Sequence, residues 1–300
     1  MTDTVYKETV VKSALTKLKR KVPYGWDLNP YRGCEHGCRY CYAMGTHRYL
    51  DSNDFFGEVY VKTNIAKVLE KELDCPSWKG ETVNIGGVTD SYQPAEARYK
   101  LMPDILKLLI KFKTPAVIST KSKLILRDYD LIDRLSRLTY VNIASTVTTM
   151  DESVREKVEP GSSSSSERFE ILREFRKTNA STGLHLMPII PYITDNERNF
   201  DSMFQKASEC GVHYVLPGTL YLRGCTRQAF FDFVKNEFPS EYEKLLSLYK
   251  TGGADKDYKT GLYEIVNRLR NKYRLSSSYA KPMKEKLAGK QGQTFMQLRL

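Results

Sequence analysis

Residues 24–41, YGWDLNPYRGCEHGCRYC, join a short strand pattern to three closely spaced cysteines. The strand pattern covers 24–30, and Cys34, Cys38 and Cys41 follow on a stretch that reads as a loop. A strand followed by a loop with reactive side chains is typical of α/β proteins whose chemistry lies at the carboxyl ends of parallel strands. A fold of this type predicts that the same unit recurs along the chain.

The unit does recur, because runs rich in β-branched residues alternate with stretches that have apolar residues at helical spacing. Strands are expected at 24–30, 82–87, 115–119, 140–146, 184–190 and 213–217, and helices at 64–73, 101–112, 128–137, 166–179 and 199–210. This alternation predicts an α/β fold with a parallel sheet, most simply a partial (β/α)6 barrel of the TIM type with added C-terminal helices. An open, doubly wound sheet is the alternative, since periodicity does not give the strand order.

The 300 residues divide by composition into three expected parts. Residues 1–23 read as a basic N-terminal extension, 24–235 as the partial barrel, and 236–300 as a helical, basic C-terminal extension. One long helix is expected over 226–249 and a basic helix over 258–274, because both stretches carry apolar residues at helical spacing.

The net charge of +11 is concentrated at the two ends of the chain. Residues 1–22 hold six Lys or Arg against two acidic residues, and 268–300 hold nine against Glu285 alone. Such ends predict contact with nucleic acid, or else solvated tails that keep the protein soluble. Because no run of 18 apolar residues and no secretory signal is visible, we expect no membrane partner and a cytoplasmic location.

The six cysteines favour metal binding in a reducing compartment over a disulfide framework. Three of them lie within eight residues, and the others are scattered, at Cys75, Cys210 and Cys225. Three thiolates on one short loop suit three irons of a [4Fe-4S] cluster and leave the fourth iron open. The alternative is a structural zinc site that adds His36 or His47, although the spacing lacks the second cysteine pair typical of such sites.

The cysteine loop resembles the signature of the radical S-adenosylmethionine superfamily, and the wider segment NPYRGCEHGCRYCYA (29–43) is similar to the branch that contains spore photoproduct lyase. The supporting segments are GGVTDSYQPAE (86–96), STKSKLILRDYDLI (119–132), STVTTMD (145–151), EPGSSSSSER (159–168) and PIIPYITD (188–195). The resemblance implies a cluster that cleaves S-adenosylmethionine to a 5′-deoxyadenosyl radical, which abstracts hydrogen from a substrate. It also implies an electron donor such as a flavodoxin or a ferredoxin.

The resemblance assigns roles to two tyrosines of the cysteine loop. Tyr40 would pack near the adenine of S-adenosylmethionine, or serve as a hydrophobic prop for the loop. Tyr42 matches a tyrosine implicated in hydrogen-atom relay in spore photoproduct lyase, with simple packing as the alternative.

Further cofactor contacts are expected just after the later strands. Hydroxyl and carboxylate groups of Thr89, Asp90 and Ser91 would accept from the cofactor's ammonium, or close an Asx turn. Lys121 would pair with the methionyl carboxylate, or be an exposed loop lysine. Ser145 would reach the ribose hydroxyls or the carboxylate, or satisfy local backbone groups.

One departure from the branch leaves the substrate open. Spore photoproduct lyase has a hydrogen-donating cysteine just before the segment that matches Thr89 and Asp90, whereas this chain has Gly86, Gly87 and Val88 there. Cys225, after the last strand, is a hypothetical radical partner or an ordinary loop thiol. The remaining alternatives are an enzyme acting on nucleic acid, an enzyme acting on a peptide or small metabolite, and a non-catalytic metal-binding protein.

Two other features have structural explanations. Ser164 or Ser165 is expected to cap the helix that contains Glu167 and Arg168. His185 lies in an apolar strand pattern and is expected to be a hydrogen-bonded core histidine.

Overall fold

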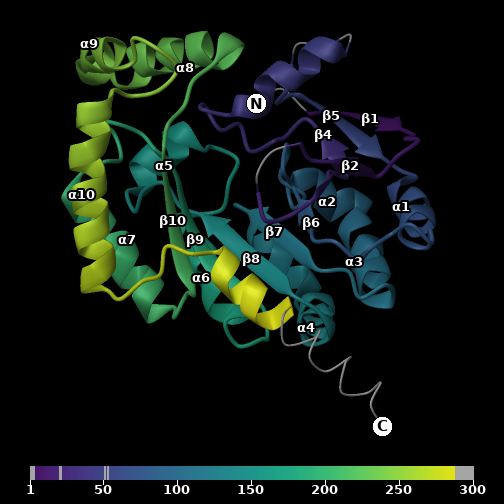
Figure 1. The fold of residues 1–300 in the computed structure, drawn as a ribbon. Helices are drawn as coiled ribbons and strands as arrows, with labels where there is room; N and C mark the ends of the chain where they lie inside the picture. Colours follow the sequence, from purple (N-terminus) through teal and green to yellow (C-terminus); the bar gives the residue numbers. More distant parts are fainter. Residues whose placement is uncertain (1–3, 20–21, 51, 53, 288–300) are drawn as a thin grey trace.

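The computed structural model describes residues 4–19, 22–50, 52 and 54–287. Within these residues, seven strands form one sheet in the order β10-β9-β8-β7-β6-β3-β2 (Figure 1). Their bounds are β2 (Leu15–Lys17), β3 (Trp26–Leu28), β6 (Val83–Ile85), β7 (Ala116–Thr120), β8 (Val141–Thr146), β9 (Ser181–Ile189) and β10 (Tyr214–Thr219). All neighbours in this sheet are parallel except β2, which pairs antiparallel with β3.

The strand order confirms the partial barrel and excludes the doubly wound alternative. From β3 to β10 the strands follow one another in space as they do in the chain. A doubly wound sheet instead reverses its strand order at a switch point. The strands β2 and β10 lie at opposite edges of the sheet, which is therefore open rather than a closed barrel.

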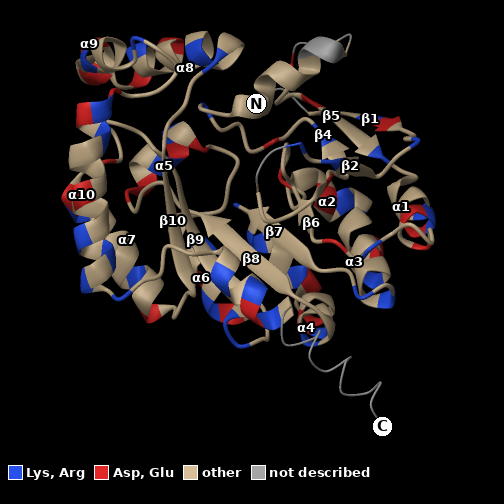
Figure 2. Cartoon of the chain, viewed as in Figure 1, with Lys and Arg blue, Asp and Glu red and all other residues tan. Residues whose placement is uncertain are grey.

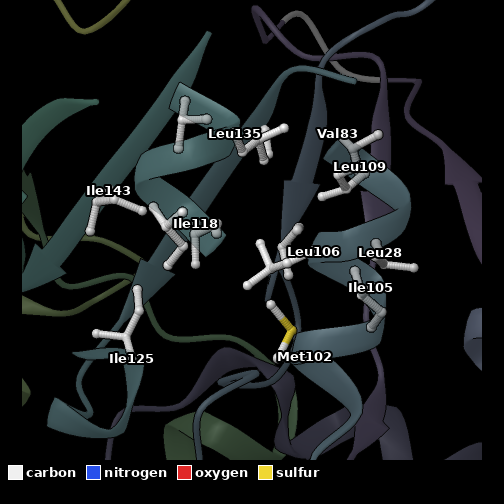
Figure 3. Packing of buried hydrophobic residues seen from close by; sticks show 14 of the residues in the cluster. Leu28, Val83, Met102, Ile105, Leu106, Leu109, Ile118, Ile125, Leu135 and Ile143 are labelled. Atoms are coloured by element: carbon white, nitrogen blue, oxygen red, sulfur yellow. The ribbon is translucent and has the colours of Figure 1, made fainter. Parts of the chain in front are cut away.

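The expected helices α1 (Ile65–Leu73), α3 (Leu101–Lys111), α4 (Tyr129–Leu138), α6 (Ser165–Phe175) and α7 (Glu197–Glu209) connect these strands. Figure 3 shows part of this packing: Val83, Ile118 and Ile143 of the sheet share one apolar cluster with Leu106 and Leu109 of α3 and Leu135 of α4. Fully burying one such side chain contributes about 1.5–3 kcal/mol. Because side chains alternate along a strand, the residues between these apolar ones face the other side of the sheet.

Short elements interrupt the connections near the carboxyl ends of the strands. These are the helices α2 (Pro94–Tyr99) and α5 (Glu152–Val158) and the 3-10 helices η1 (Tyr42–Tyr49) and η2 (Lys123–Asp128). The expected cap is confirmed at α6, where Ser164 accepts from the backbone N–H of Glu167 and the Glu167 side chain accepts from that of Ser164. This capping box fixes the start of α6 within the serine run, whose last two residues are helical.

A second sheet supports the cysteine loop. It contains β1 (Val5–Thr9), β5 (Glu58–Lys62) and β4 (Tyr31–Arg32), in the order β1-β5-β4. Residues 1–23, expected as an extension, thus contribute β1 to this sheet and β2 to the main one. The strand β4 leads directly into Gly33 and Cys34, so the second sheet determines where the loop starts.

The expectation of one long helix over 226–249 is wrong. Two helices, α8 (Gly224–Glu237) and α9 (Pro239–Leu248), replace it, and Phe238 between them has an extended φ of -140°. Pro239 causes the break, because proline removes a backbone donor and disfavours helical backbone at the residue before it. The basic helix α10 (Lys256–Lys272) follows as expected.

The last described helix, over 280–287, covers the amino ends of the sheet strands. Its Met283 packs with Val117 and Tyr140, and the Thr82 hydroxyl donates to the Met283 sulfur at 3.8 Å. Thr82 and Tyr140 come just before β6 and β8, so this end of the sheet lies opposite the cysteine loop. Residues 288–300 of the expected C-terminal extension lie outside the described part of the chain.

Charged residues lie mostly on the helices and loops, while β8, β9 and β10 are tan in Figure 2. Part of the basic C-terminal region is engaged within the protein. Arg268 pairs with Glu197 at 2.8 Å and Lys272 with Asp201 at 2.7 Å. None of the described helices is long and apolar enough to cross a membrane.

Candidate active site

A cavity of about 550 Å³ opens at the carboxyl ends of the sheet strands. Segments far apart in the sequence line it: the cysteine loop, the residues after β6 and β7, and inward-facing residues of β8, β9 and β10. Its lining includes Cys34, Cys38, Cys41, Tyr40, Tyr42, Thr89, Asp90 and Lys121. The structure thus brings eight of the eleven candidate residues together at one cavity; Ser91, Ser145 and Cys225 are not among the lining residues.

The cysteine loop is held from two sides. On one side, the Gln93 amide donates to the carbonyl of Gly33 and accepts from the backbone N–H of Glu35, both at 3.0 Å. On the other side, the Arg39 N–H donates to Val158 O and the Gly161 N–H to His36 O, both at 3.0 Å. Two of the segments noted for their resemblance, 86–96 and 159–168, therefore supply the supports of the loop.

Gly33 is required at the start of the loop by both conformation and space. Its φ is +92°, and a Cβ there would lie 2.1 Å from the carbonyl oxygen of Glu58. Only glycine adopts this backbone readily and leaves room for β5 to pass. The close approach fixes Cys34, whose N–H donates to Phe55 O at 3.0 Å.

The three cysteines are free thiols, with Cys34 and Cys38 buried and Cys41 half-buried. Burial raises all three pKa values, that of Cys38 to about 12 even though Lys121 lowers it. Metal binding must therefore displace their protons. Among the described residues, no group of three or more His, Cys, Asp or Glu side chains has the geometry to hold a metal ion. In a cubane, by contrast, each cysteine binds a different iron.

The Asp90 carboxylate lies next to Cys34 and accepts several hydrogen bonds. Its carboxylate accepts from the backbone N–H groups of Tyr92 and Lys121 and from the Thr120 hydroxyl, and it lies 3.0 Å from Nε2 of His36. Burial opposes ionisation, but His36 and these donors outweigh it and lower the pKa of Asp90 to about 2. The expected turn is therefore present, and the carboxylate also connects the β6 and β7 loops with the cysteine loop.

Two hydroxyls near Asp90 are buried without a protein partner. Thr89 Oγ1 and Ser91 Oγ have no hydrogen bond to any described residue. A buried polar group without a partner costs about 1–3 kcal/mol. Thr89 is among the residues that line the cavity, whereas Ser91 is not.

Tyr40 and Lys121 both lie near the buried ion pair of Glu159 and Arg168, which the sequence did not predict. The Tyr40 hydroxyl donates to the Glu159 carboxylate, which pairs with Arg168 at 2.5 Å. Both members of this pair are fully buried. Arg168 also donates to the carbonyls of Thr146 and Ser163. The pair joins the two ends of the segment 159–168, beneath the cysteine loop.

Lys121 lies near the Cys38 thiol and the Glu159 carboxylate. Its ammonium is 6.0 Å from the centre of the Tyr40 ring. Burial works against its charge, but Cys38 and Glu159 outweigh burial and raise its pKa. The side chain is only partly buried and lines the cavity, so its positive charge lies at the cavity wall.

Tyr42 and Cys225 occupy the rim. The Tyr42 side chain is 68% exposed, and its hydroxyl donates to the carbonyl of Gly87, which ties the cysteine loop to the segment after β6. Cys225 is exposed at the start of α8, beside η1. The neighbouring Thr226 donates to Cys41 O at 3.2 Å, so α8 supports the cysteine loop even though Cys225 does not line the cavity.

The strand register separates Ser145 from the site. Ser145 Oγ is buried and donates to Thr120 O at 3.3 Å, which matches the local backbone role. Its neighbour Thr146 lines the cavity instead. Because side chains alternate along β8, a difference of one residue exchanges the outer face for the inner face.

His185 also lines the cavity, so the expectation of a core histidine is corrected. One ring nitrogen is hydrogen-bonded to Tyr214, as a core role would require, but the ring faces the cavity rather than the helices. The signal in the sequence was its position between Leu184 and Leu186, both of which pack on the outer face.

The fold and the site define an α/β half-barrel in which three cysteines, a lysine and Thr89 line one cavity. The family profile described as "Radical SAM superfamily" matches residues 28–202, which is more than half of the chain. An uncharacterized protein of Mycobacterium tuberculosis is 36% identical over 280 residues, covering 91% of this chain and 82% of its own. The chain belongs to the radical SAM superfamily.

Solved structures show the same fold. A spore photoproduct lyase mutant with bound AdoMet and dinucleoside spore photoproduct aligns with a TM-score of 0.67 and 13% identity, over 89% of this chain and 79% of that chain. The Streptococcus suis protein SuiB, bound to precursor peptide SuiA, aligns with a TM-score of 0.52 and 13% identity, over 84% of this chain and 48% of that chain. At such identities the likeness concerns the fold alone.

Proposed function

We propose that the protein is a radical S-adenosylmethionine enzyme that binds a [4Fe-4S] cluster on Cys34, Cys38 and Cys41. The observation that carries the proposal is the convergence of these three thiols on one cavity with Thr89 and Lys121. Sulfur ligands suit iron-sulfur clusters, and three of them leave one iron free for a further ligand.

The cavity has groups that fit S-adenosylmethionine beside such a cluster. The Lys121 ammonium suits a carboxylate, and the unpartnered Thr89 hydroxyl suits an amino or carboxylate group. Tyr40 offers an aromatic ring for the adenine, fixed by its hydrogen bond to Glu159. When bound, the reduced cluster supplies the electron that cleaves the cofactor's sulfonium to methionine and a 5′-deoxyadenosyl radical.

The protein's own residues orient the cofactor and exclude water. The Glu159–Arg168 pair holds Tyr40 in place, and Asp90 fixes the loops after β6 and β7 by accepting from their backbone and side chains. Tyr42 ties the cysteine loop to Gly87 at the rim, and packing is its simplest role. The electron donor would be a flavodoxin or a ferredoxin, in a cytoplasmic setting.

The substrate class remains a proposal in two forms. The first is a nucleic acid, supported by the basic ends of the chain and by the fold shared with spore photoproduct lyase. The second is a peptide or small metabolite, supported by the fold shared with peptide-bound SuiB and by the near-neutral strands around the cavity. A steep loss of affinity for DNA or RNA with salt would select the first form, because phosphate contacts release counterions.

Anaerobic reconstitution tests the proposed enzyme. Iron and sulfide should bind, and reduction in the presence of S-adenosylmethionine should yield 5′-deoxyadenosine. Cys34→Ser, Cys38→Ser and Cys41→Ser should each abolish both results. Cys75→Ser is the matched control, because Cys75 is exposed and outside the cavity. One zinc per chain without cleavage would instead establish the zinc alternative.

A further inference from the structure

The inner face of the half-barrel carries polar side chains among apolar ones, which sets it apart from an apolar barrel core. Barrel interiors are usually filled with branched apolar side chains. Here Asn84 lies between Val83 and Ile85, Asn142 between Val141 and Ile143, and His185 between Leu184 and Leu186. The apolar neighbours pack in the outer clusters, so the polar residues between them face inward.

Side chains of the adjacent strands β8, β9 and β10 form a hydrogen-bonded chain with a fixed direction. The Asn142 amide nitrogen faces the carbonyl of Ser181 at 3.4 Å, so its Oδ1 must face Tyr214. The Tyr214 hydroxyl donates to that Oδ1 at 2.9 Å and lies 3.2 Å from Nε2 of His185. Because the hydroxyl has only one proton, it must accept from His185, whose Nε2 therefore carries the hydrogen.

The sequence makes room for this chain at Gly183. A Cβ at that position would lie 2.0 Å from Cζ of Tyr214. The phenol crosses β9 through the space that glycine leaves and reaches from β10 to β8. The Tyr279 ring, just before the helix over 280–287, lies 5.9 Å from the Tyr214 ring.

This arrangement leaves Nδ1 of His185 as a bare acceptor. It has no hydrogen-bond partner among the described residues, and the ring lines the cavity. Burial, and next the charge of Lys121, lower the pKa of His185 to about 4, so the ring is neutral at pH 7. A neutral acceptor in this place selects a hydrogen-bond donor.

The charges around the cavity restrict which chemical groups can bind beside His185. Among the described residues that line the cavity, Asp90 is the carboxylate, and it is already paired with His36. Lys121 is needed for the cofactor under the proposed function. Asn84 and Tyr24 accompany His185 in the lining and carry no charge at neutral pH. The layer therefore suits an uncharged group, and the cavity volume of about 550 Å³ suits a small one.

We propose that His185 is a substrate-recognition residue, whose Nδ1 accepts a hydrogen bond from an uncharged N–H or O–H group of the substrate. Tyr214 and Asn142 are positioning residues that hold the ring in the accepting tautomer. The claim that the hydrogen-bond donor belongs to the substrate rests on the proposed function. The claim that Nδ1 of His185 is an acceptor does not, because it follows from the hydrogen bonds of the protein.

Nitrogen NMR of the full chain with heavy-nitrogen-labelled histidine tests this assignment. The chain has four histidines, and His185→Phe identifies the signals of His185. The sample is reconstituted anaerobically and saturated with S-adenosylhomocysteine. The probes are 2-pyrrolidinone, which has one amide N–H, and N-methyl-2-pyrrolidinone, which lacks it.

We expect His185 to show a protonated Nε2 and a bare Nδ1 at pH 7, and only 2-pyrrolidinone to shift the Nδ1 signal. His185→Phe should weaken binding of 2-pyrrolidinone roughly 2- to 10-fold, the loss expected for one neutral hydrogen bond. Tyr214→Phe should leave the chain folded but mix the two tautomers of His185. His213, whose Nδ1 already accepts from the Thr182 N–H, is the internal reference.

Three results would overturn the proposal: a protonated Nδ1, equal or absent responses to the two probes, or a shift of Nδ1 caused by S-adenosylhomocysteine alone. The last would assign the acceptor to the cofactor. The titration is repeated on chain without cluster, so failure of reconstitution, which counts against the proposed enzyme, does not decide the result for His185.

Discussion

Glu159→Gln should be strongly destabilising even though it changes the shape of the side chain very little. Glu159 and Arg168 are both fully buried and 2.5 Å apart, and the Tyr40 hydroxyl donates to the same carboxylate. Removing one charge of such a pair leaves the other buried and uncompensated, at a cost of about 3–5 kcal/mol. For a chain of 300 residues the unfolding entropy is about 0.6 kcal/mol per degree, so Tm should fall by roughly 5–8 °C.

Scanning calorimetry of cluster-free protein measures the effect, with Glu237→Gln as the matched control. Glu237 pairs with Lys157 at 3.4 Å on the surface, where both side chains are nearly half exposed. Such a pair is worth about 0–1 kcal/mol, so Tm should fall by less than about 2 °C. The double variant Glu159→Gln with Arg168→Met should recover part of the loss, because it removes the unpaired charge. Equal Tm values for Glu159→Gln and Glu237→Gln would refute the reasoning.

Two further predictions concern the loops around the site. The pKa of Asp90 falls from 3.8 to about 2 on folding, so its ionised form contributes about 2 kcal/mol above pH 4, and this contribution disappears as the pH falls through 2. Urea unfolding of wild type and Asp90→Asn from pH 7 to pH 2 should show a gap that closes only in the acid range; a gap independent of pH would contradict this. Gly33→Ala should prevent cluster binding because its Cβ would meet the Glu58 carbonyl, whereas Gly80→Ala, with a similar φ of +67° but no atom within 4 Å, should retain iron. Iron and sulfide analysis after reconstitution compares the two, and equal iron contents would show that the crowding at Gly33 does not matter.

The positions of the parallel strands were predictable because most strands are short runs of β-branched residues between helical patterns, but their order was decided only by the folded chain. The prediction of a single helix over 226–249 was wrong, because the apolar spacing continues across Pro239 whereas proline interrupts the helix. The second sheet was not predicted, because β1 and β5 are far apart in the sequence and partly exposed. Pairing between distant strands depends on the folded chain rather than on local pattern.

The site was predictable where one loop carries the chemistry and less so where the fold brings groups together. Cys34, Cys38 and Cys41 are neighbours in the sequence, so their spacing alone indicates a shared ligand. Nothing in the sequence pattern indicates that Glu159 and Arg168 pair, and Glu and Arg are seldom fully buried unless they are paired. Only the folded chain shows that they meet.

The inward-facing residues explain why periodicity alone misjudged His185. A strand with helices on one face and a packed barrel interior on the other is expected to be apolar throughout. In such a strand, the polar residue of V-N-I or L-H-L looks like an isolated exception. In this chain the exceptions recur at Asn84, Asn142 and His185, one on each of three strands, all on the inner face. A recurrent polar residue at an inward position is costly unless a partner or a ligand meets it. Asn142 has protein partners, whereas His185 keeps one nitrogen bare beside the cavity, and a bound ligand can offset that cost.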